Sequence, residues 1–338
     1  MKRKIRFNLG FVNTYRCFFF LAIILFCGLF TKNFFTPYNI RAVTGNGSLV
    51  MWLGLGFTIC LIAGHMDLTA MHMSTLAALL CLGLRAKSGL SWGLAILAAT
   101  LVGVVIGMIN GTLTAQFMIP SFIVTLGMQF VLKGFMYIYT GGAEMSIGRD
   151  YAFNELLNDS VAFLPFSLYF LITTAVVFAA WIFLRFTRTG RNIYMVGGNL
   201  ETAWLAGIPS KIVTTLAFVI SSASCALGGA LNGIYSGAAS ITMGEKGISP
   251  LMIALTASII GGTSLYGGKG SVIWTWVSLI AISFLKSLFK KTEQQVLVIA
   301  VILIICIVYE TLAQYFRSQV VGRRPNLHIE SLRERARH

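Results

Sequence analysis

A glycine-rich stretch that contains a lysine, residues 261–272, is the first candidate for chemistry in this sequence. It has the sequence G-G-T-S-L-Y-G-G-K-G-S-V, and glycines beside Lys and Ser are typical of loops that cradle phosphate. A P-loop requires Gly, then four residues, then Gly-Lys-Ser/Thr. Thr263 stands where the first glycine belongs, and Gly270 stands where the magnesium-binding hydroxyl belongs. The spacing therefore excludes a P-loop here.

Asp67 is a carboxylate inside an otherwise apolar stretch, residues 47–84. A helix of that length would cross nearly two bilayer cores, so the chain must break, and residues 64–67 are the only candidate. A carboxylate near the membrane is costly and commonly functional, but Asp is also a good helix N-cap. We therefore expect Asp67 either to contact cargo or to cap the helix that follows.

Soft metal ligands surround Asp67. They are His65, Met66, Met71, His72 and Met73. Because His65 and His72 are seven residues apart, one helix face could hold both, as a transition-metal site would require. Methionine is nevertheless an ordinary filler of apolar helices, and the 6 cysteines are scattered without a Cys-x-x-Cys pair. We expect neither a metal site nor a disulfide.

Two asparagine sites have similar sequences. Residues 107–114 read G-M-I-N-G-T-L-T, and residues 229–236 read G-A-L-N-G-I-Y-S. A second similar pair follows in the same order, with I-P-S-F-I-V-T-L at 119–126 and I-S-P-L-M-I-A-L at 248–255. The two pairs together predict an internal duplication.

These sites belong to a strongly apolar chain. Of its 338 residues 57% are hydrophobic and 11% are charged, whereas soluble domains carry about 25% charged residues. The composition predicts an all-α polytopic membrane protein with about ten transmembrane helices. The predicted spans are 17–31, 46–63, 68–84, 90–115, 121–140, 161–184, 212–236, 249–266, 271–289 and 295–316.

The net charge of +15 gathers in three places: before the first span, within residues 185–211 and after the last span. An even number of spans puts all three on one side, which the positive-inside rule makes cytoplasmic. We expect a cytoplasmic N-terminal segment (1–16), a transmembrane domain (17–316) and a cytoplasmic tail (317–338). This charge pattern indicates a membrane surface and not nucleic acid.

The predicted topology makes the duplication an inverted repeat, because the spans that carry the two asparagine sites run in opposite directions. Transporters build midplane substrate sites from inverted repeats with short, interrupted helices. Pro120 and Pro250 begin the matching segments, and a helix that starts inside the membrane offers free N–H groups to a polar cargo. Hydrogen bonding between helices is an equal alternative for both asparagines. The predicted cargo pathway comprises Asp67, Asn110, Thr125, Asn232 and Ala254.

Gly103, Gly107 and Gly111 repeat at every fourth position. This spacing puts small residues on one helix face, where they let another helix approach closely. We predict that the three glycines serve helix packing.

The longest polar segment in the interior of the chain, residues 185–211, has helix-end signals. Gly197-Gly198 predicts a break, Asn199 is a good N-cap, and residues 201–206 form a short helix that Gly207 closes. A short capped helix on the cytoplasmic face of a transporter indicates a docking element. The alternative is a plain loop between the two repeats.

At this point the sequence resembles the permease subunits of ribose-type ABC importers, which carry monosaccharides and related small polar solutes. Residues 194–208 match the family pattern Y-x-x-G-G-N-x-x-A-A-x-x-x-G-I except that Thr202 replaces the first alanine. Residues 261–272 match G-G-T-S-L-x-G-G-x-G-S-V, and 119–127 match I-P-x-F-I-V-T-L-G. An Asn-Gly pair precedes the last motif, as in the family. The resemblance covers about residues 45–315.

The resemblance implies a transport subunit and not an enzyme, located in the bacterial plasma (inner) membrane. It implies an ABC ATPase that binds the ATP, an extracytoplasmic solute-binding protein, and a second permease copy or paralogue. No cofactor is expected in this chain itself, and the glycine-rich stretch is expected to be a packing loop. The residues expected to couple to the ATPase are Gly198, Asn199, Glu201, Ala203, Gly207 and Ile208.

Two departures from the family pattern fall in predicted transport regions. The family pattern G-G-I-D-L-S-x-G corresponds to residues 64–71, which keep only the first Gly, the Asp and the Leu and have Thr in place of Ser. Residues 248–257 lack the acidic residue that the family tends to have there. The departures leave the cargo open. The alternative function is a self-powered secondary transporter or channel for a small solute or metal ion. A membrane enzyme is disfavoured because the sequence shows no catalytic set.

Overall fold

The computed structural model is almost entirely helical. It describes residues 25, 28–29, 34–148, 150–160, 164–243, 249–289, 291, 293–305 and 308. Within these ranges the only sheet is the antiparallel pair of β1 (Met145–Ser146) and β2 (Ala238–Ala239). The helices are α2 (Pro37–Ile62), α3 (Ala70–Ser88), α4 (Trp92–Ala115), α5 (Ser121–Thr140), α6 (Ala152–Asn158), α7 (Leu168–Phe186), α8 (Arg188–Gly198), α9 (Leu200–Leu205), α10 (Ser210–Ser236), α11 (Pro250–Ile260) and α12 (Val272–Leu288).

Many of these helices have the length and composition of membrane helices. Of the described helices, 5 are long and apolar enough to cross a membrane, namely α2, α4, α5, α7 and α10. Shorter apolar helices are α11, α12 and Glu293–Ile305. The prediction of an all-α polytopic membrane protein is confirmed. Segments 1–16 and 317–338, most of predicted span 17–31 and the end of span 295–316 lie outside the described residues.

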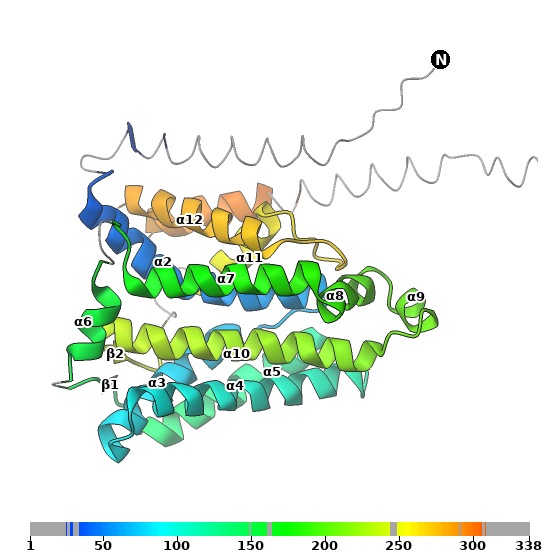
Figure 1. Ribbon diagram of the computed structural model, residues 1–338, viewed down its shortest axis with the longest axis horizontal. Helices are drawn as coiled ribbons and strands as arrows, with labels where there is room; N and C mark the ends of the chain where they lie inside the picture. Colours follow the sequence, from blue (N-terminus) through cyan, green and yellow to red (C-terminus); the bar gives the residue numbers. More distant parts are fainter. Residues whose placement is uncertain are drawn as a thin grey trace, which may run out of the picture.

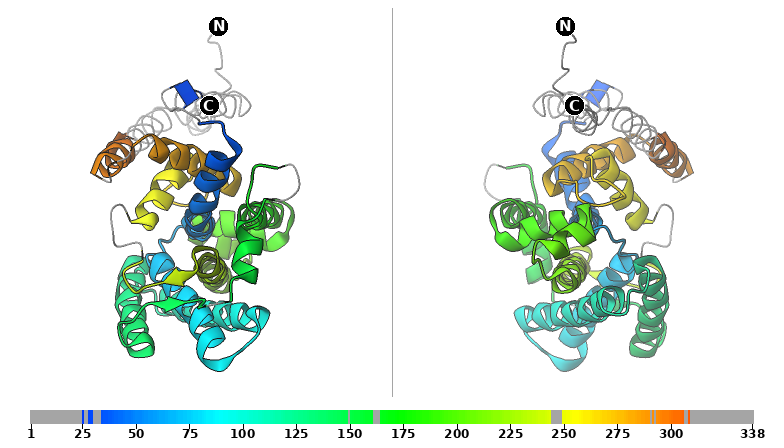
Figure 2. Two further views of the ribbon diagram at one scale, coloured as in Figure 1. Left: turned by 90° about the vertical axis from the view of Figure 1, so that its left-hand side faces the viewer. Right: turned by 90° about the vertical axis from the view of Figure 1, so that its right-hand side faces the viewer.

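Helix α2 lies at the centre of the bundle. The most apolar part of α2 is 94% buried, and α10, α11, α12 and α7 all pack against it. A helix that is apolar on every side is stable only when it is surrounded. Figures 1 and 2 show α3, α4 and α5 on one side of this centre and α11 and α12 on the other.

Helices α4 and α10 pack closely through the glycine ladder, which we define as Gly103, Gly107 and Gly111. A β-carbon on these residues would come within 2.5, 2.7 and 2.6 Å of α10 atoms, closer than van der Waals contact allows. The nearest α10 residues are, in order, Ala226, Phe218 and Thr215. The order shows that the two helices run antiparallel, and the predicted packing role of these glycines is confirmed.

The predicted span 249–266 is wrong in length, because α11 stops at Ile260. Gly262 has a φ of 83°, and its N–H donates to the Ile259 carbonyl at 2.8 Å, while the Thr263 N–H donates to the Ser258 carbonyl at 2.9 Å. These bonds form a Schellman motif, which closes a helix with a left-handed glycine. A helix of 11 residues is about 17 Å long, roughly half of a bilayer core.

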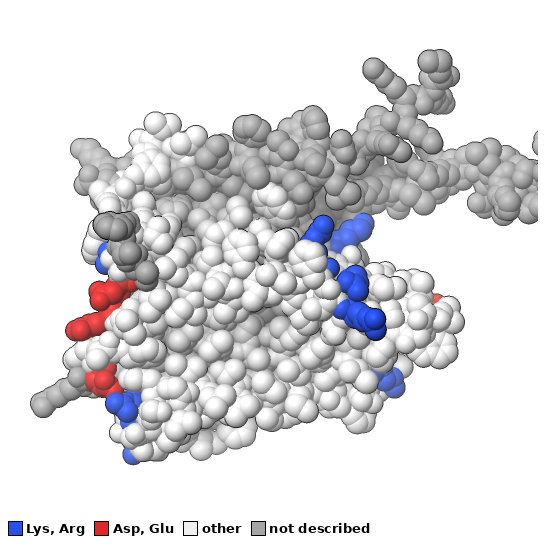
Figure 3. Space-filling view, viewed as in Figure 1, with Lys and Arg blue, Asp and Glu red and all other residues white. Residues whose placement is uncertain are grey.

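Charged side chains gather at the two ends of the bundle. Figure 3 shows Lys and Arg at the end that carries α8, and Asp and Glu together with further Lys and Arg at the end beside α6, with uncharged residues between. Arg185, Arg188 and Arg191 belong to the first end, and Glu155 and Asp159 belong to the second. A broad uncharged band between charged ends is what a bilayer core requires.

Candidate functional site

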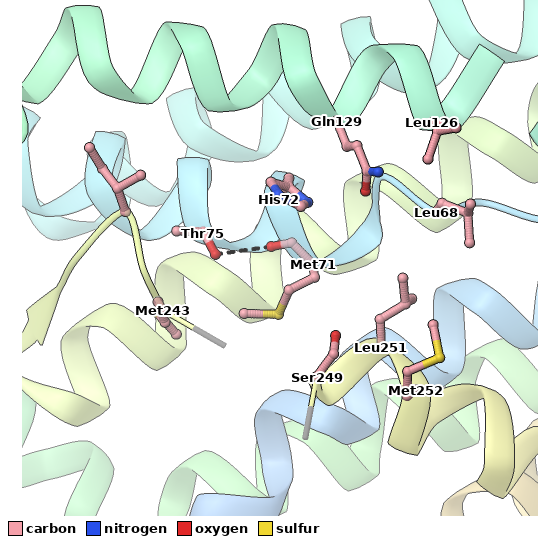
Figure 4. Close-up of a pocket in the computed structure, with 11 residues that line it drawn as sticks. Leu68, Met71, His72, Thr75, Leu126, Gln129, Met243, Ser249, Leu251 and Met252 are labelled. Atoms are coloured by element: carbon pink, nitrogen blue, oxygen red, sulfur yellow. Dashed lines mark hydrogen bonds between the residues drawn. The ribbon is translucent and has the colours of Figure 1, made fainter. Parts of the chain in front are cut away.

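A cavity of about 440 Å³ opens among α3, α5 and the start of α11. Figure 4 shows its side chains converging from these helices and from the segment after β2. The lining residues are Leu68, Met71, His72, Thr75, Leu126, Gln129, Ile241, Met243, Ser249, Leu251 and Met252. The volume falls within the range of small-molecule sites.

The N-terminus of α11 forms one wall of this cavity. Pro250 occupies the first turn, as the sequence predicted, and Ser249, Leu251 and Met252 line the cavity. Because α11 is short and ends near the α8 end of the bundle, its first turn lies inside the apolar band. A helix N-terminus carries partial positive charge and N–H donors, which suit hydroxyl or carbonyl oxygens of a cargo.

The polar groups of the cavity are uncharged side chains and one imidazole. They are His72, Thr75, Gln129 and Ser249. None of the described lining residues is Asp, Glu, Lys or Arg; residues 244–248, which connect Met243 to Ser249, are not described. The remaining wall is made of leucine, isoleucine and methionine. This surface favours a neutral solute with both polar and apolar faces.

Asp67 lies beside the cavity and is fully buried. Its carboxylate accepts hydrogen bonds from the Ser221 hydroxyl at 2.8 Å, from the Thr69 N–H at 3.1 Å and from the Thr69 hydroxyl. Thr69 is the N-cap residue of α3 but makes no side-chain cap bond, whereas the bond from the Thr69 N–H to Asp67 is of the kind that an N-cap side chain accepts, so a capping role for Asp67 stays a prediction. Asp67 also joins the break after α2 to α10, and these hydrogen bonds satisfy a buried carboxyl group that would otherwise be costly.

The predicted pathway residues are buried, and none of them lines the cavity in this conformation. The Asn110 amide donates to the Thr69 hydroxyl at 3.3 Å, which places Asn110 in the Asp67 network. The Thr125 hydroxyl approaches the Met66 carbonyl at 3.4 Å. Asn232 and Ala254 are buried in α10 and α11, outside this network. The structure thus brings Asp67, Asn110 and Thr125 together around residues 66–69.

The predicted cytoplasmic segment folds as two helices, α8 and α9, separated by the extended residue Asn199. The break comes just after Gly197-Gly198, since α8 continues through both glycines. The Asn199 side chain accepts from the Thr202 N–H at 2.8 Å, as predicted for an N-cap. Gly207, with φ 76°, closes α9 through a Schellman motif, which confirms the predicted C′ role.

Helix α9 presents an apolar surface on the outside of the bundle. Trp204 and Leu205 are 68% and 71% exposed, while Ala203 is buried. Glu201 lies in the first turn of α9, and Ile208 is buried after its end. An exposed aromatic and aliphatic pair on a short, capped helix is typical of a protein docking surface.

Comparison with known proteins identifies the family of this chain. Residues 39–308 match the family described as branched-chain amino acid transport system / permease component. The chain belongs to this family. It is therefore a membrane transport subunit and not an enzyme, and ATP hydrolysis in such importers belongs to a separate chain.

Curated relatives of this permease cover most of its length. The D-allose transport system permease protein AlsC of Escherichia coli (strain K12) is 30% identical over 264 residues, 78% of this chain and 79% of the relative. The autoinducer 2 import system permease protein LsrC of Salmonella typhi is 28% identical over 255 residues, 75% of this chain and 71% of the relative. No solved structure matches the permease.

Several residues that line the permease cavity were not predicted from the sequence. His72 was noticed only as a candidate metal ligand, and no group of His, Cys, Asp or Glu in the described part of the chain could hold a metal. Gln129 is a polar residue within the apolar helix α5, which is a signal that could have identified it. Ser249 and Met252 belong to the segment 248–255, already singled out for its repeat pattern.

Proposed function

We propose that this permease conducts a small, neutral, polyhydroxylated solute of the monosaccharide class through the cavity among α3, α5 and α11. The observation that carries the proposal is the cavity lining, in which no described residue is Asp, Glu, Lys or Arg. The likeness to a D-allose permease supports it, since D-allose is a monosaccharide. ATP bound to a partner ATPase drives the import, and the permease itself holds no cofactor.

The uncharged lining argues against an amino acid as cargo, although the family description mentions branched-chain amino acids. A zwitterion would bring an ammonium and a carboxylate into an apolar site, and each ion costs several kcal/mol to desolvate without a partner. Hydroxyl groups need only hydrogen-bonding partners such as Gln129, Thr75 and Ser249. A sugar also has an apolar face, which suits the methionine and leucine walls.

We propose that Asp67, Asn110, Thr125, Asn232 and Ala254 belong to a pathway that continues from this cavity. The same proposal includes an inverted repeat with about ten spans. Helices α4 and α10 run antiparallel, and each carries an Asn-Gly pair in its last turns. A proline-started helix follows each of them, α5 after Pro120 and α11 from Pro250. Alternating access would then expose these residues in turn.

The assembly that fits this function places both termini in the cytoplasm of a bacterium and the permease in its plasma membrane. The Lys- and Arg-rich end with α8 and α9 supports that orientation. The ATPase docks on α9 through Leu200, Trp204 and Leu205, supported by the caps at Asn199 and Gly207. A solute-binding protein delivers cargo at the opposite end, and a second permease copy or paralogue completes the pathway.

ATP-dependent uptake by the complete complex in proteoliposomes tests the cargo class. The permease is purified with its ATPase, and its binding protein is added with radiolabelled D-allose, D-ribose or L-leucine. We expect ATP-dependent accumulation of a monosaccharide and none of leucine. Accumulation of leucine without either sugar would contradict the proposal. Uptake that needs no ATPase would favour a secondary transporter instead.

A single substitution links that uptake to the cavity. Gln129→Leu keeps the side-chain size and removes the amide, and loss of a buried hydrogen bond to cargo costs about 1–3 kcal/mol. We expect sugar uptake to fall about tenfold while the complex still assembles and hydrolyses ATP. Phe130→Leu is the matched control, because Phe130 is 66% exposed on the same helix. Unchanged uptake by the Gln129→Leu complex would place the cargo elsewhere.

A further inference from the structure

Segments far apart in the sequence meet without intervening side chains at the end of α2. A β-carbon on Gly197, near the end of α8, would overlap the Ile62 carbonyl oxygen. A β-carbon on Gly268, in the loop between α11 and α12, would lie 2.5 Å from the Gly198 Cα. We call this contact of Gly64, Gly197, Gly267 and Gly268 the glycine junction.

Hydrogen bonds hold the glycine junction together. The Gly268 N–H donates to the Ile62 carbonyl at 2.9 Å. The Tyr194 hydroxyl of α8 donates to the Gly270 carbonyl at 3.0 Å. Burial raises the pKa of the Tyr194 phenol, with the Arg185 charge opposing, so the hydroxyl keeps its proton at neutral pH. The glycine-rich loop 261–272 is thus a packing element that clamps α8 onto the end of α2.

The chain that leaves the glycine junction is the connector, which we define as residues 62–68. It begins with a Schellman motif at Gly64, whose φ is 85°. The Met66 N–H then donates to the Ser121 hydroxyl at 3.2 Å, and the Met66 carbonyl faces Thr125 of the same helix, α5. Asp67 binds Ser221 of α10. The connector is therefore bonded to α5 and α10 soon after it leaves the glycine junction.

The connector ends at the cavity. Leu68 is its last residue and a lining residue, and Met71 and His72 follow in the first turn of α3. The opposite wall is Leu126 and Gln129 of α5, the helix that Met66 contacts. A displacement of Ile62 therefore reaches both walls of the cavity through consecutive residues and the bonds they make.

We propose that the connector transmits ATPase-driven movement of α8 and α9 to the cavity, with Gly197 as the positioning residue; the proposal rests on the proposed function. Contact between backbones has no flexible side chain to absorb a shift, so movement of α8 displaces Ile62 directly. The competing route is α10, which follows α9 along the chain after Ile208 and Pro209. The two routes predict different outcomes when the glycine junction alone is altered.

Gly197→Ala tests the connector in the complete complex with its ATPase and binding protein. The added methyl group meets the Ile62 carbonyl, so the junction must open while α9 and α10 stay unchanged. We expect ATP hydrolysis to persist and sugar transported per ATP to fall about tenfold. Gly198→Ala, whose methyl group would lie 3.8 Å from the nearest atom, should lose less. Gly134→Ala is the control, because no atom lies within 4 Å of its added β-carbon.

A labelling experiment separates transmission from simple stabilisation. A Gln129→Cys complex on a background without native cysteines reports access to the cavity for a small polar thiol reagent. Labelling should differ between nucleotide-free and ATP-trapped complexes when Gly197 is present, and this difference should vanish with Gly197→Ala. Persistence of the difference, or normal transport per ATP, would overturn the proposal in favour of the α10 route.

Tyr194→Phe decides the matter if Gly197→Ala fails to assemble. It removes the hydrogen bond to Gly270 without adding volume. We expect normal assembly with transport per ATP reduced about threefold, in keeping with one lost hydrogen bond. Wild-type transport per ATP in this variant would overturn the proposal. A wild-type complex that transports no sugar would instead refute the proposed function.

Discussion

The glycine ladder and the glycine junction both bring backbones into contact, but they join different kinds of structure. The ladder joins two straight helices, α4 and α10, along several turns, and its glycines all come from one helix. The junction joins the end of α2, the end of α8 and a loop, and its glycines come from all three. The ladder fixes two helices along their length, whereas the junction joins segments at their ends, where we propose that movement of α8 passes to Ile62.

The glycines of the ladder and those of the junction also differ in backbone conformation. The ladder glycines are helical, so glycine is needed there only for lack of space. Gly64, Gly267 and Gly268 of the junction have φ values of 85°, 81° and 71°, which other residues rarely adopt. Substitutions in the ladder should therefore cost stability through overlap, and those in the junction should combine strain with a loss of coupling.

Gly107→Val should have the largest effect, because it breaks the ladder. Its β-carbon would lie 2.7 Å from backbone atoms of Phe218 and Val219, which cannot move without displacing α10. We expect a loss of more than about 3 kcal/mol and little monodisperse protein in detergent. Gly134→Val is the control, because its β-carbon would meet open space. Near-normal yield and thermal stability of Gly107→Val would show that the ladder is not the rigid interface.

Gly64→Ala should have an intermediate effect that separates strain from coupling. A left-handed alanine costs about 1–2 kcal/mol, and the added methyl group would lie 3.5 Å from Gly197. Gly142→Ala imposes similar strain, with φ 83°, but its methyl group would meet no atom within 4 Å. Thermal unfolding should therefore shift by similar amounts in both variants. In the Gly64 variant alone, labelling of Gln129→Cys should be the same in nucleotide-free and ATP-trapped complexes. If labelling responds to ATP in the same way in both variants, the effect of Gly64 is strain and not coupling.

Asn199→Ala should have the smallest effect on the free energy of unfolding, because it alters only the N-cap of α9 and none of the glycines of the junction. It removes the N-cap bond to the Thr202 N–H and costs about 1 kcal/mol locally in α9. Faster hydrogen exchange in α9 and weaker stimulation of ATP hydrolysis by loaded binding protein should follow. Asn199→Asp keeps the cap acceptor and should restore both. A loss of activity in Asn199→Asp as well would point to direct contact between Asn199 and the ATPase.

Local patterns predicted much of the membrane fold. Runs of apolar residues located α4, α5, α10 and α12 nearly to their ends, since a membrane helix needs little more than length and hydrophobicity. The fourfold spacing of the ladder glycines and the caps at Asn199 and Gly207 were likewise visible, because each depends on residues within a few positions of one another.

Other features could not be predicted in this way. The length of α11 was misjudged because the predicted span was continued through Gly261-Gly262, where the left-handed Gly262 ends the helix. The cavity lining combines residues from 68–75, 126–129, 241–243 and 249–252, so no single stretch indicates it. The pathway residues, chosen as polar or repeated positions, do not line the cavity, and two of them, Asp67 and Asn110, are buried and bonded to other polar side chains in this conformation.

The sequence alone determined an all-helical membrane protein with a short capped helix at 200–205, because composition, periodicity and caps act over short distances, and its motifs identified the permease family. The tertiary structure decided what Asp67 binds, where the cavity lies and which glycines meet. These depend on the approach of segments up to 206 residues apart, as between Ile62 and Gly268 (268 − 62 = 206). Such contacts form only when helices pack, since packing brings distant backbones close enough for a missing side chain to matter.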